Sequence, residues 1–126
     1  MRFSISVFLL AFFSTGFSPS SAAEGIDIDP ATLSACKFST PPMLIDGNTA
    51  SKPEMEELSV AVRTYIAEMQ ASLDCLKAAA DAAESREQAI IHQLYNNGVE
   101  QLNFVAGEYN EQVRAYDRYR LLRPTN

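Results

Sequence analysis

Two stretches of the chain carry apolar side chains at helical spacing. In the first, apolar positions recur every three or four residues, and neither Gly nor Pro occurs between residues 54 and 87. The positions are Met55, Leu58, Val62, Tyr65, Met69, Ser72, Leu76 and Ala79, of which Ser72 alone is polar. Flanking apolar residues widen this set into one broad face. The pattern predicts a helix of about thirty residues.

This first helix has a recognisable start. Ser51-Lys52-Pro53-Glu54 matches a capping box, in which the serine hydroxyl accepts from the third amide and the glutamate reaches back. Pro53 is compatible with this position, because amides of the first turn have no partner within the helix. The sequence therefore predicts that the helix begins immediately after Ser51.

The second stretch has the same period and predicts a second long helix. Its apolar face is formed by Ile91, Tyr95, Gly98, Leu102, Val105, Tyr109, Gln112 and Tyr116. His92, Val99, Ala106 and Val113 flank this face. The helix is expected to run to about Arg120 and to end before Pro124.

A turn between the two helices is expected within residues 81–85, where Asp81 with Glu84, or Ser85 with Gln88, provides capping chemistry. One unbroken helix is the alternative, because no Gly marks the turn. Folding the chain at Ala83 predicts the pairs Leu76–Ile91, Leu73–Tyr95, Met69–Gly98, Val62–Val105 and Leu58–Tyr109. It also brings Glu54, Glu56 and Glu57 near Arg114, Arg118 and Arg120. The expected fold is all-α: an antiparallel, coiled-coil-like hairpin over residues 51–120, followed by a tail, residues 121–126.

Residues 24–50 are expected to form an extended arm with little regular structure. Three prolines interrupt this segment, and Asp46-Gly47-Asn48 is typical of a turn. The sixteen residues from Cys36 to Lys52 reach at most about 53 Å, whereas helix from Lys52 to Cys75 spans about 34 Å. A bridged arm can therefore run back along the hairpin. That path predicts residues 43–45 (Met43-Leu44-Ile45) in a groove lined by Val60, Ala61 and Ala67.

Cys36 and Cys75 are the two cysteines of the chain, and we interpret them as a disulfide pair. The alternative is two buried thiols that stay unpaired. A bridge would close a loop of about forty residues and stabilise the fold by roughly 3–4 kcal/mol on the chain-entropy model.

The amino-terminal segment, residues 1–23, resembles a secretory signal peptide. Arg2 precedes an almost continuous apolar run over residues 3–13, and Ser21-Ala22-Ala23 offers small residues for cleavage after Ala23. A membrane anchor is the alternative, but this run is short against the roughly 20 residues needed to span a bilayer. Cleavage leaves 103 of the 126 residues and, with the loss of Arg2, changes the net charge from −6 to −7.

Residues 33–36 (Leu33-Ser34-Ala35-Cys36) match the lipobox that directs lipid attachment to a bacterial cysteine. That reaction requires the cysteine directly after the apolar run. Glu24, Asp27 and Asp29 lie between, so we favour ordinary cleavage and a disulfide-bonded Cys36.

Charge and composition disfavour several function classes. A net charge of −6 makes the chain a poor ligand for nucleic-acid phosphates. His92 is the single histidine, so any catalytic triad would have to use it, and we expect a boundary side chain. No glycine-rich phosphate loop occurs. We therefore predict no catalytic residue, no metal site, no cofactor, no nucleic-acid partner and no stable membrane span.

Two patterns on the second helix are candidates for binding. Tyr95-Asn96-x-x-Val99 recurs fourteen residues later as Tyr109-Asn110-x-x-Val113. The simpler interpretation is a helical core with polar tips, and the alternative is a Tyr/Asn-lined binding surface. Ile90, Asn97 and Phe104 share one side of the same helix and are predicted to form an interaction surface. Its ligand would be a protein, and a second copy in a four-helix homodimer is one candidate.

Three motifs together resemble a family of short, exported, uncharacterised proteobacterial proteins. They are residues 42–47 (Pro-Met-Leu-Ile-Asp-Gly), the Glu54-Met55…Tyr65…Met69…Leu73-x-Cys75 series, and residues 109–116 (Tyr-Asn-Glu-Gln-Val-Arg-Ala-Tyr). The resemblance covers nearly all of residues 36–119. It implies a helical topology and an exported location, and it transfers no catalytic or binding residue.

These observations predict a non-enzymatic protein of a bacterial envelope, periplasmic or secreted, with a structural or protein-interaction role. A chaperone-like periplasmic protein that binds unfolded clients is the alternative. A small enzyme built around His92 has the least support.

Overall fold

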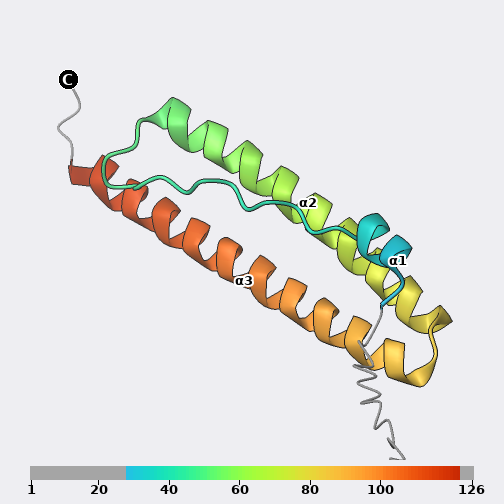
Figure 1. Cartoon of the computed structure of the whole chain (residues 1–126). Helices are drawn as coiled ribbons and strands as arrows, with labels where there is room; N and C mark the ends of the chain where they lie inside the picture. Colours follow the sequence, from blue (N-terminus) through green and yellow to red (C-terminus); the bar gives the residue numbers. More distant parts are fainter. Residues whose placement is uncertain (1–27, 123–126) are drawn as a thin grey trace, which may run out of the picture.

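The computed structural model describes residues 28–122, and within this range the chain forms three helices. They are α1 (Pro30–Ala35), α2 (Lys52–Ala82) and α3 (Ser85–Leu122). α2 and α3 pack side by side as an antiparallel pair, and the arm runs along them (Figure 1). The predicted all-α hairpin with a disulfide-tethered arm is confirmed. The predicted signal peptide, residues 1–23, and the tail beyond Leu122 lie outside the described residues.

α2 begins with the expected capping box. The Ser51 hydroxyl accepts from the Glu54 amide at 3.4 Å, and the Glu54 carboxylate accepts from the Ser51 amide at 2.7 Å. The helix then extends for 31 residues and buries one face. The buried residues are Met55, Leu58, Val62, Tyr65, Met69, Ser72, Leu73, Leu76 and Ala80. Seven of them lie on the predicted stripe, so the 3.6-residue period identified the core face.

The turn lies at residues 83–84, where Ala83 adopts an extended backbone with φ −88° and ψ 155°. This break excludes the single unbroken helix. The Gln88 side chain donates to the Ala80 carbonyl at 3.0 Å. Gln88 therefore satisfies a carbonyl at the end of α2, rather than completing a cap at the start of α3. α3 continues to Leu122, slightly beyond the expected end near Arg120.

The arm contains a short helix, so the expectation of little regular structure in residues 24–50 was wrong in part. The Asp29 side chain accepts from the Ala31 amide at 2.9 Å, and Pro30 occupies the first turn of α1. An Asp cap followed by Pro is a favourable helix start. α1 ends at Ala35, and its C-cap residue, Cys36, lies against α2, to which the disulfide joins it.

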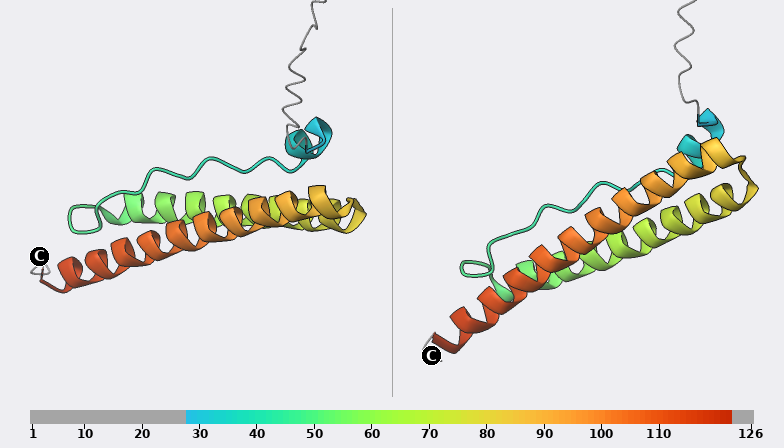
Figure 2. Two further views of the ribbon diagram at one scale, coloured as in Figure 1. Left: turned by 60° about the horizontal axis from the view of Figure 1, so that its bottom comes forward. Right: turned by 90° about the horizontal axis from the view of Figure 1, so that it is seen from below.

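The core consists of three clusters along the rod, and the arm contributes to each. Near the turn, Cys36 joins Leu76, Ala80 and Ile91. In the middle, Phe38 packs against Tyr65, Met69 and Val105. At the open end, Leu44 and Ile45 pack against Ala50, Met55, Leu58 and Val62. The arm is thus a third layer along the hairpin (Figure 2).

The helix register differs from the expected one around Gly98. Leu76 and Ile91 share a cluster as predicted, and so do Leu58 and Tyr109. The Val62–Val105 pair was wrong, because these residues lie in different clusters, whereas the Met69–Gly98 and Leu73–Tyr95 pairs stay predictions. A Cβ at Gly98 would lie 2.6 Å from the ring of Phe38 and 2.8 Å from Leu73. The arm's aromatic ring fills the space over the glycine, and Met69 packs in the cluster of Val105.

The predicted proximity of charges at the helix ends holds for Glu56 and Arg120, which line the same hollow, although no ion pair joins α2 to α3 in the described residues. In residues 28–122 the ion pairs join residues of one helix, Lys52 with Glu56 and Arg114 with Glu111. The hydrogen bond from Arg114 lowers the pKa of Glu111. Exposed pairs of this kind contribute little to stability, so apolar packing and the arm hold the two helices together.

Candidate interaction surfaces

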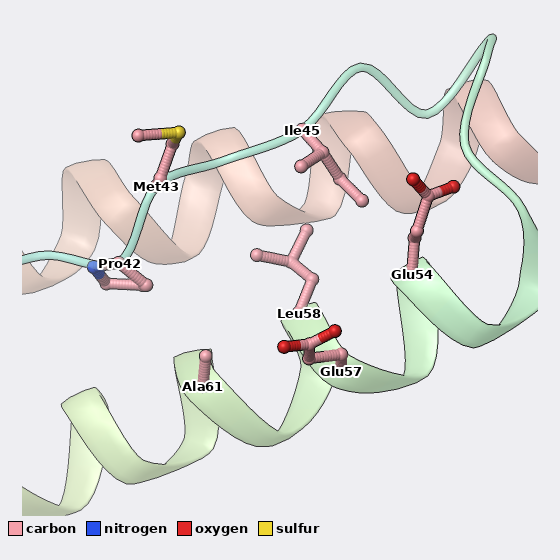
Figure 3. A pocket seen from close by; sticks show the side chains of 7 residues that line it. All are labelled: Pro42, Met43, Ile45, Glu54, Glu57, Leu58 and Ala61. Atoms are coloured by element: carbon pink, nitrogen blue, oxygen red, sulfur yellow. The ribbon is translucent and has the colours of Figure 1, made fainter.

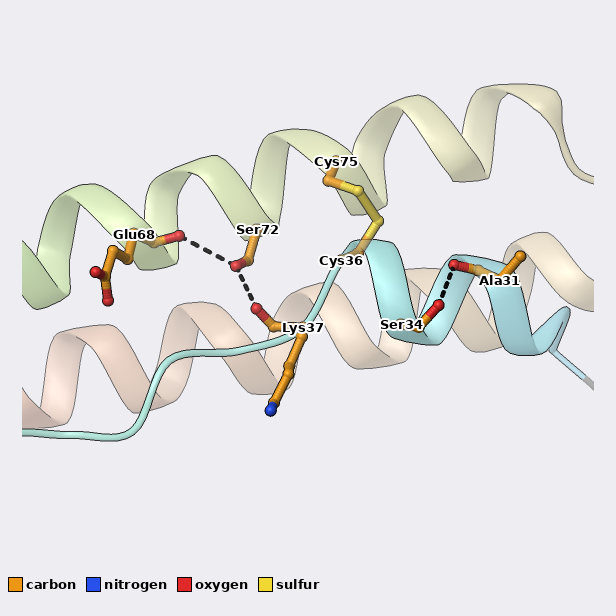
Figure 4. Close-up of a disulfide and its surroundings, with 7 residues drawn as sticks. All are labelled: Ala31, Ser34, Cys36, Lys37, Glu68, Ser72 and Cys75. Carbon is orange, nitrogen blue, oxygen red and sulfur yellow. Dashed lines mark hydrogen bonds between the residues drawn. A yellow bond between two sulfur atoms is a disulfide. The ribbon is translucent and has the colours of Figure 1, made fainter.

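The arm is fixed at its start by covalent and hydrogen bonds. Cys36 and Cys75 form the predicted disulfide, with Cα atoms 5.3 Å apart. Beside the bridge, the hydroxyl of Ser72 lies 2.7 Å from the Lys37 carbonyl oxygen and 3.1 Å from that of Glu68 (Figure 4). Ser72, the one polar residue of the α2 stripe, therefore holds the arm, because its hydroxyl donates a hydrogen bond to the Lys37 carbonyl of the arm.

The arm is fixed again where it turns into α2. The Gly47 amide donates to the Gln112 side-chain oxygen at 2.9 Å. A Cβ at Gly47 would lie 1.9 Å from the Gln112 backbone oxygen and 2.9 Å from the Tyr116 nitrogen. Gly47 has a negative φ, so glycine is required here for close approach and not for backbone conformation. The Asn48 amide donates to Asp46 and lowers the pKa of that carboxyl group.

Between these anchors the arm covers one side of the groove between α2 and α3. Leu44 and Ile45 face the core, as expected, but Met43 is 89% exposed. Val60 is 64% exposed and Ala67 is exposed, so the predicted lining was wrong apart from Ala61. The arm follows the groove between both helices because contacts there bury apolar surface of both.

A hollow of about 330 Å³ remains beside the arm. Its lining residues are Pro42, Met43, Ile45, Glu54, Glu57, Leu58 and Ala61. In Figure 3, Ile45 and Leu58 point toward each other across it, whereas Met43 points away. Glu54 is engaged in the helix cap. The hollow is therefore an apolar gap under the arm with carboxylates at its rim.

The predicted interaction surface of Ile90, Asn97 and Phe104 lies along one flank of α3. Phe104 is 67% exposed and Asn97 is exposed, whereas Ile90 is half-buried. The flank thus presents one large apolar side chain to solvent, together with a neighbouring amide. Leu121 and Leu122, at the end of α3, are 83% and 81% exposed.

The opposite side of the α2–α3 groove, which we call the open face, carries no arm residue in its hollows. A hollow of about 220 Å³ near the turn is lined by Leu76, Lys77, Ala80, Ile91, His92 and Tyr95. A second of about 220 Å³ toward the other end is lined by Lys52, Met55, Glu56, Ser59, Tyr109, Val113, Tyr116 and Arg120. Tyr95, Tyr109 and Val113 of the Tyr/Asn repeat therefore line this face. The repeat in the sequence indicated a Tyr/Asn-lined binding surface only as an alternative, because the sequence does not show which side of the hairpin the arm leaves uncovered.

The described residues offer little for catalysis. Among residues 28–122, no three His, Cys, Asp or Glu side chains gather as a metal site would require. His92 is exposed at the edge of a hollow. The Tyr65 hydroxyl is buried without a hydrogen-bond partner in the described part of the chain, and burial raises its pKa. Its ring belongs to the middle core cluster, so we assign it to packing.

None of the three described helices is long and apolar enough to cross a membrane. No protein-family model, no curated protein and no solved structure matches this chain.

Proposed function

We propose that the protein is a non-enzymatic, exported component of a bacterial envelope that acts through contacts with proteins. The observation that carries this proposal is the asymmetry of the rod. One side of the hairpin is closed by a disulfide-held arm, whereas the other side has hollows lined largely by half-buried and buried apolar side chains, and the α3 flank exposes Phe104.

The exported location has three supports. A disulfide that anchors the arm suits an oxidising compartment, since cytosolic thiols are kept reduced. Residues 1–23 have the charge, apolar run and cleavage residues of a signal peptide, and the three motifs resemble exported proteobacterial proteins. Intact-mass analysis of the protein recovered from a bacterial periplasm tests the location. We expect a chain that begins at Glu24 and carries no lipid; recovery of the full-length chain in the cytosol would contradict it.

The protein-binding role is supported by a fixed surface with exposed apolar groups. Phe104 projects from a helix whose opposite side is packed, so it meets a partner without a large loss of conformational freedom. Aromatic side chains of this kind are enriched at the centres of protein interfaces. The exposed Asn97 on the same flank adds a group that can hydrogen-bond to a partner.

In-cell photocrosslinking tests this role. A photoreactive residue at position 97 should give a discrete adduct with one protein in the native envelope, and Phe104→Glu should abolish that adduct while the circular dichroism spectrum is unchanged. In the matched control, the photoreactive residue replaces Ala71, which is exposed on α2 and lies away from the Asn97–Phe104 flank of α3. Equal adducts from positions 97 and 71, or an adduct indifferent to Phe104→Glu, would contradict a specific surface at this flank.

A further inference from the structure

We propose that a second copy of the chain docks on the open face in antiparallel orientation. The two-fold axis would cross α2 near residue 67 and α3 near residue 104. The proposal deepens the proposed function by naming one protein partner, and it rests on that function. It predicts a four-helix bundle with α2 over α2 and α3 over α3, and with the two arms on the outside.

The first argument is the order of charges along α2 at the open face. Lys52, Glu56 and Lys77 line the two hollows of this face. Arg63, Asp74 and Asp81 share their side of the helix, because they lie three, four or seven residues from these positions. All six side chains are exposed. Read from the start of the helix, the signs are +, −, +, −, +, −, so an antiparallel copy presents the opposite sign at every position.

This pairing has a definite centre. Around residue 67, Arg63 of one copy meets Asp74 of the other, Glu56 meets Lys77, and Lys52 meets Asp81. The midpoints of these pairs all fall within residues 66–69, which is less than one helical turn. The two-fold axis repeats each pair, so the interface contains every charge contact twice.

The second argument comes from the apolar residues of α3 and is independent of charge. Tyr95, Val99, Leu102, Ala106, Tyr109 and Val113 are half-buried in the single chain. In an antiparallel copy, Tyr95 meets Val113, Val99 meets Tyr109, and Leu102 meets Ala106. Each pair sets a large side chain against a smaller one, which favours close packing. The midpoint of all three pairs is residue 104.

The two centres lie close together in the folded hairpin. Leu73 of α2 lies against Gly98 of α3. The helices are antiparallel, so a step of six residues back along α2 corresponds to six residues forward along α3, which places residue 67 opposite residue 104. The shared clusters of Leu76 with Ile91 and of Leu58 with Tyr109 place residue 67 opposite residue 100 instead, so the two centres agree to within about one helical turn. One two-fold axis therefore pairs opposite charges along α2 and also pairs large with small apolar side chains along α3.

A second copy suits this face better than an oppositely charged partner does. The whole chain carries a net charge of −6, so two copies repel each other in general. The six exposed charges of α2 on the open face balance, so this face lets two acidic chains meet without like-charge contact. The α3 part of this contact sets Leu102 and Ala106 at its centre with tyrosines on either side, an apolar and aromatic composition typical of interface cores. Phe104 lies on the opposite flank of α3, outside this contact.

Charge exchange tests the orientation. Sedimentation equilibrium of the mature, oxidised protein at low salt should show a dimer. Glu56→Lys alone and Lys77→Glu alone should each raise the dissociation constant at least about tenfold, since each sets like charges together twice. The double variant should return it to within about threefold of wild type. Residues 56 and 77 lie about 31 Å apart on α2, so rescue can arise only between copies. Additive losses in the double variant would overturn the antiparallel arrangement.

A second pair of variants separates the open face from the α3 flank. Val99→Glu should make the protein monomeric, and Phe104→Glu should leave the dimer intact, with both variants retaining wild-type helix content. A wild-type monomer at high micromolar concentration would overturn the proposal, as would a dimer lost only with Phe104→Glu. A monomer that still gives the Phe104-dependent envelope adduct would refute the dimer and leave the proposed function standing.

Discussion

Replacement of Gly47 by alanine should detach the arm from α3. The added Cβ would lie 1.9 Å from the backbone oxygen of Gln112 and 2.9 Å from the backbone nitrogen of Tyr116. Both atoms belong to a regular helix and cannot move aside, so the turn at residues 47–49 must shift. The shift breaks the Gly47–Gln112 hydrogen bond and pulls Ile45 out of the open-end cluster.

The size of the effect follows from these contacts. Loss of the hydrogen bond removes about 1 kcal/mol, and a steric insertion into packed structure costs about 1–3 kcal/mol. These two costs add to a total loss of about 2–4 kcal/mol. For a chain of this size that corresponds to a fall in Tm of at least about 8–16 °C. Thermal unfolding of the oxidised protein, followed by circular dichroism at 222 nm, measures it.

Gly107→Ala is the matched control. A Cβ at Gly107 would meet no atom within 4 Å, and the residue lies in the interior of α3. Alanine is better than glycine in a helix by about 1 kcal/mol, so this variant should raise Tm by about 4–8 °C. A Gly47→Ala protein as stable as wild type would refute the close contact between the arm and α3.

The remaining predictions concern the other supports of the arm and of α2. The Cys36–Cys75 bridge closes a separation of 39 residues, so its reduction should lower the free energy of unfolding by about 4 kcal/mol. The helix content at about 20 °C should stay near that of the oxidised protein. An unchanged Tm after reduction would show that the bridge does not hold the arm. Ser72→Ala should cost about 1 kcal/mol in urea unfolding, since the Lys37 carbonyl loses its donor, and a neutral result would place that carbonyl in water. Hydrogen bonds from Ser51 lower the pKa of Glu54, so its carboxylate stabilises the fold at neutral pH and ceases to do so as the pH falls through this lowered value. Glu54→Gln should therefore be less stable than wild type at pH 7, with the difference starting to shrink near the ordinary pKa of 4.5 and vanishing only below the lowered value, and a difference constant across this range would exclude the cap as its cause.

The elements of the fold followed from local patterns. The α2 and α3 faces obey a 3.6-residue period, and the Ser51 cap marks the start of α2 within one residue. The cysteine pairing followed from count and reach. α1 was missed, although an Asp29-Pro30 start was visible in the sequence. A six-residue helix is too short for periodicity to reveal, so only its cap could have indicated it.

The surfaces depended on tertiary contacts that no local pattern encodes. Gly98 was paired with Met69 because both lie on predicted stripes, and the periodicity gave no sign that Phe38 from the arm lies nearest to Gly98, together with Leu73. The arm packs on one side of the groove, and this placement leaves the tyrosines of the other side uncovered. Periodicity does not show on which side the arm packs, so it could not identify the open face. Phe104 and Asn97, by contrast, were identified as exposed from their offset to the stripe.

The most direct test of the account is a nuclear Overhauser measurement between the arm and α3 in the oxidised protein. The account depends on an arm that fills one side of the groove and leaves the other open. The tip of the Phe38 ring lies against Gly98, so the ring protons should show strong Overhauser contacts to the Gly98 α-protons. Absence of these contacts would contradict the packed arm and with it the distinction between the two faces.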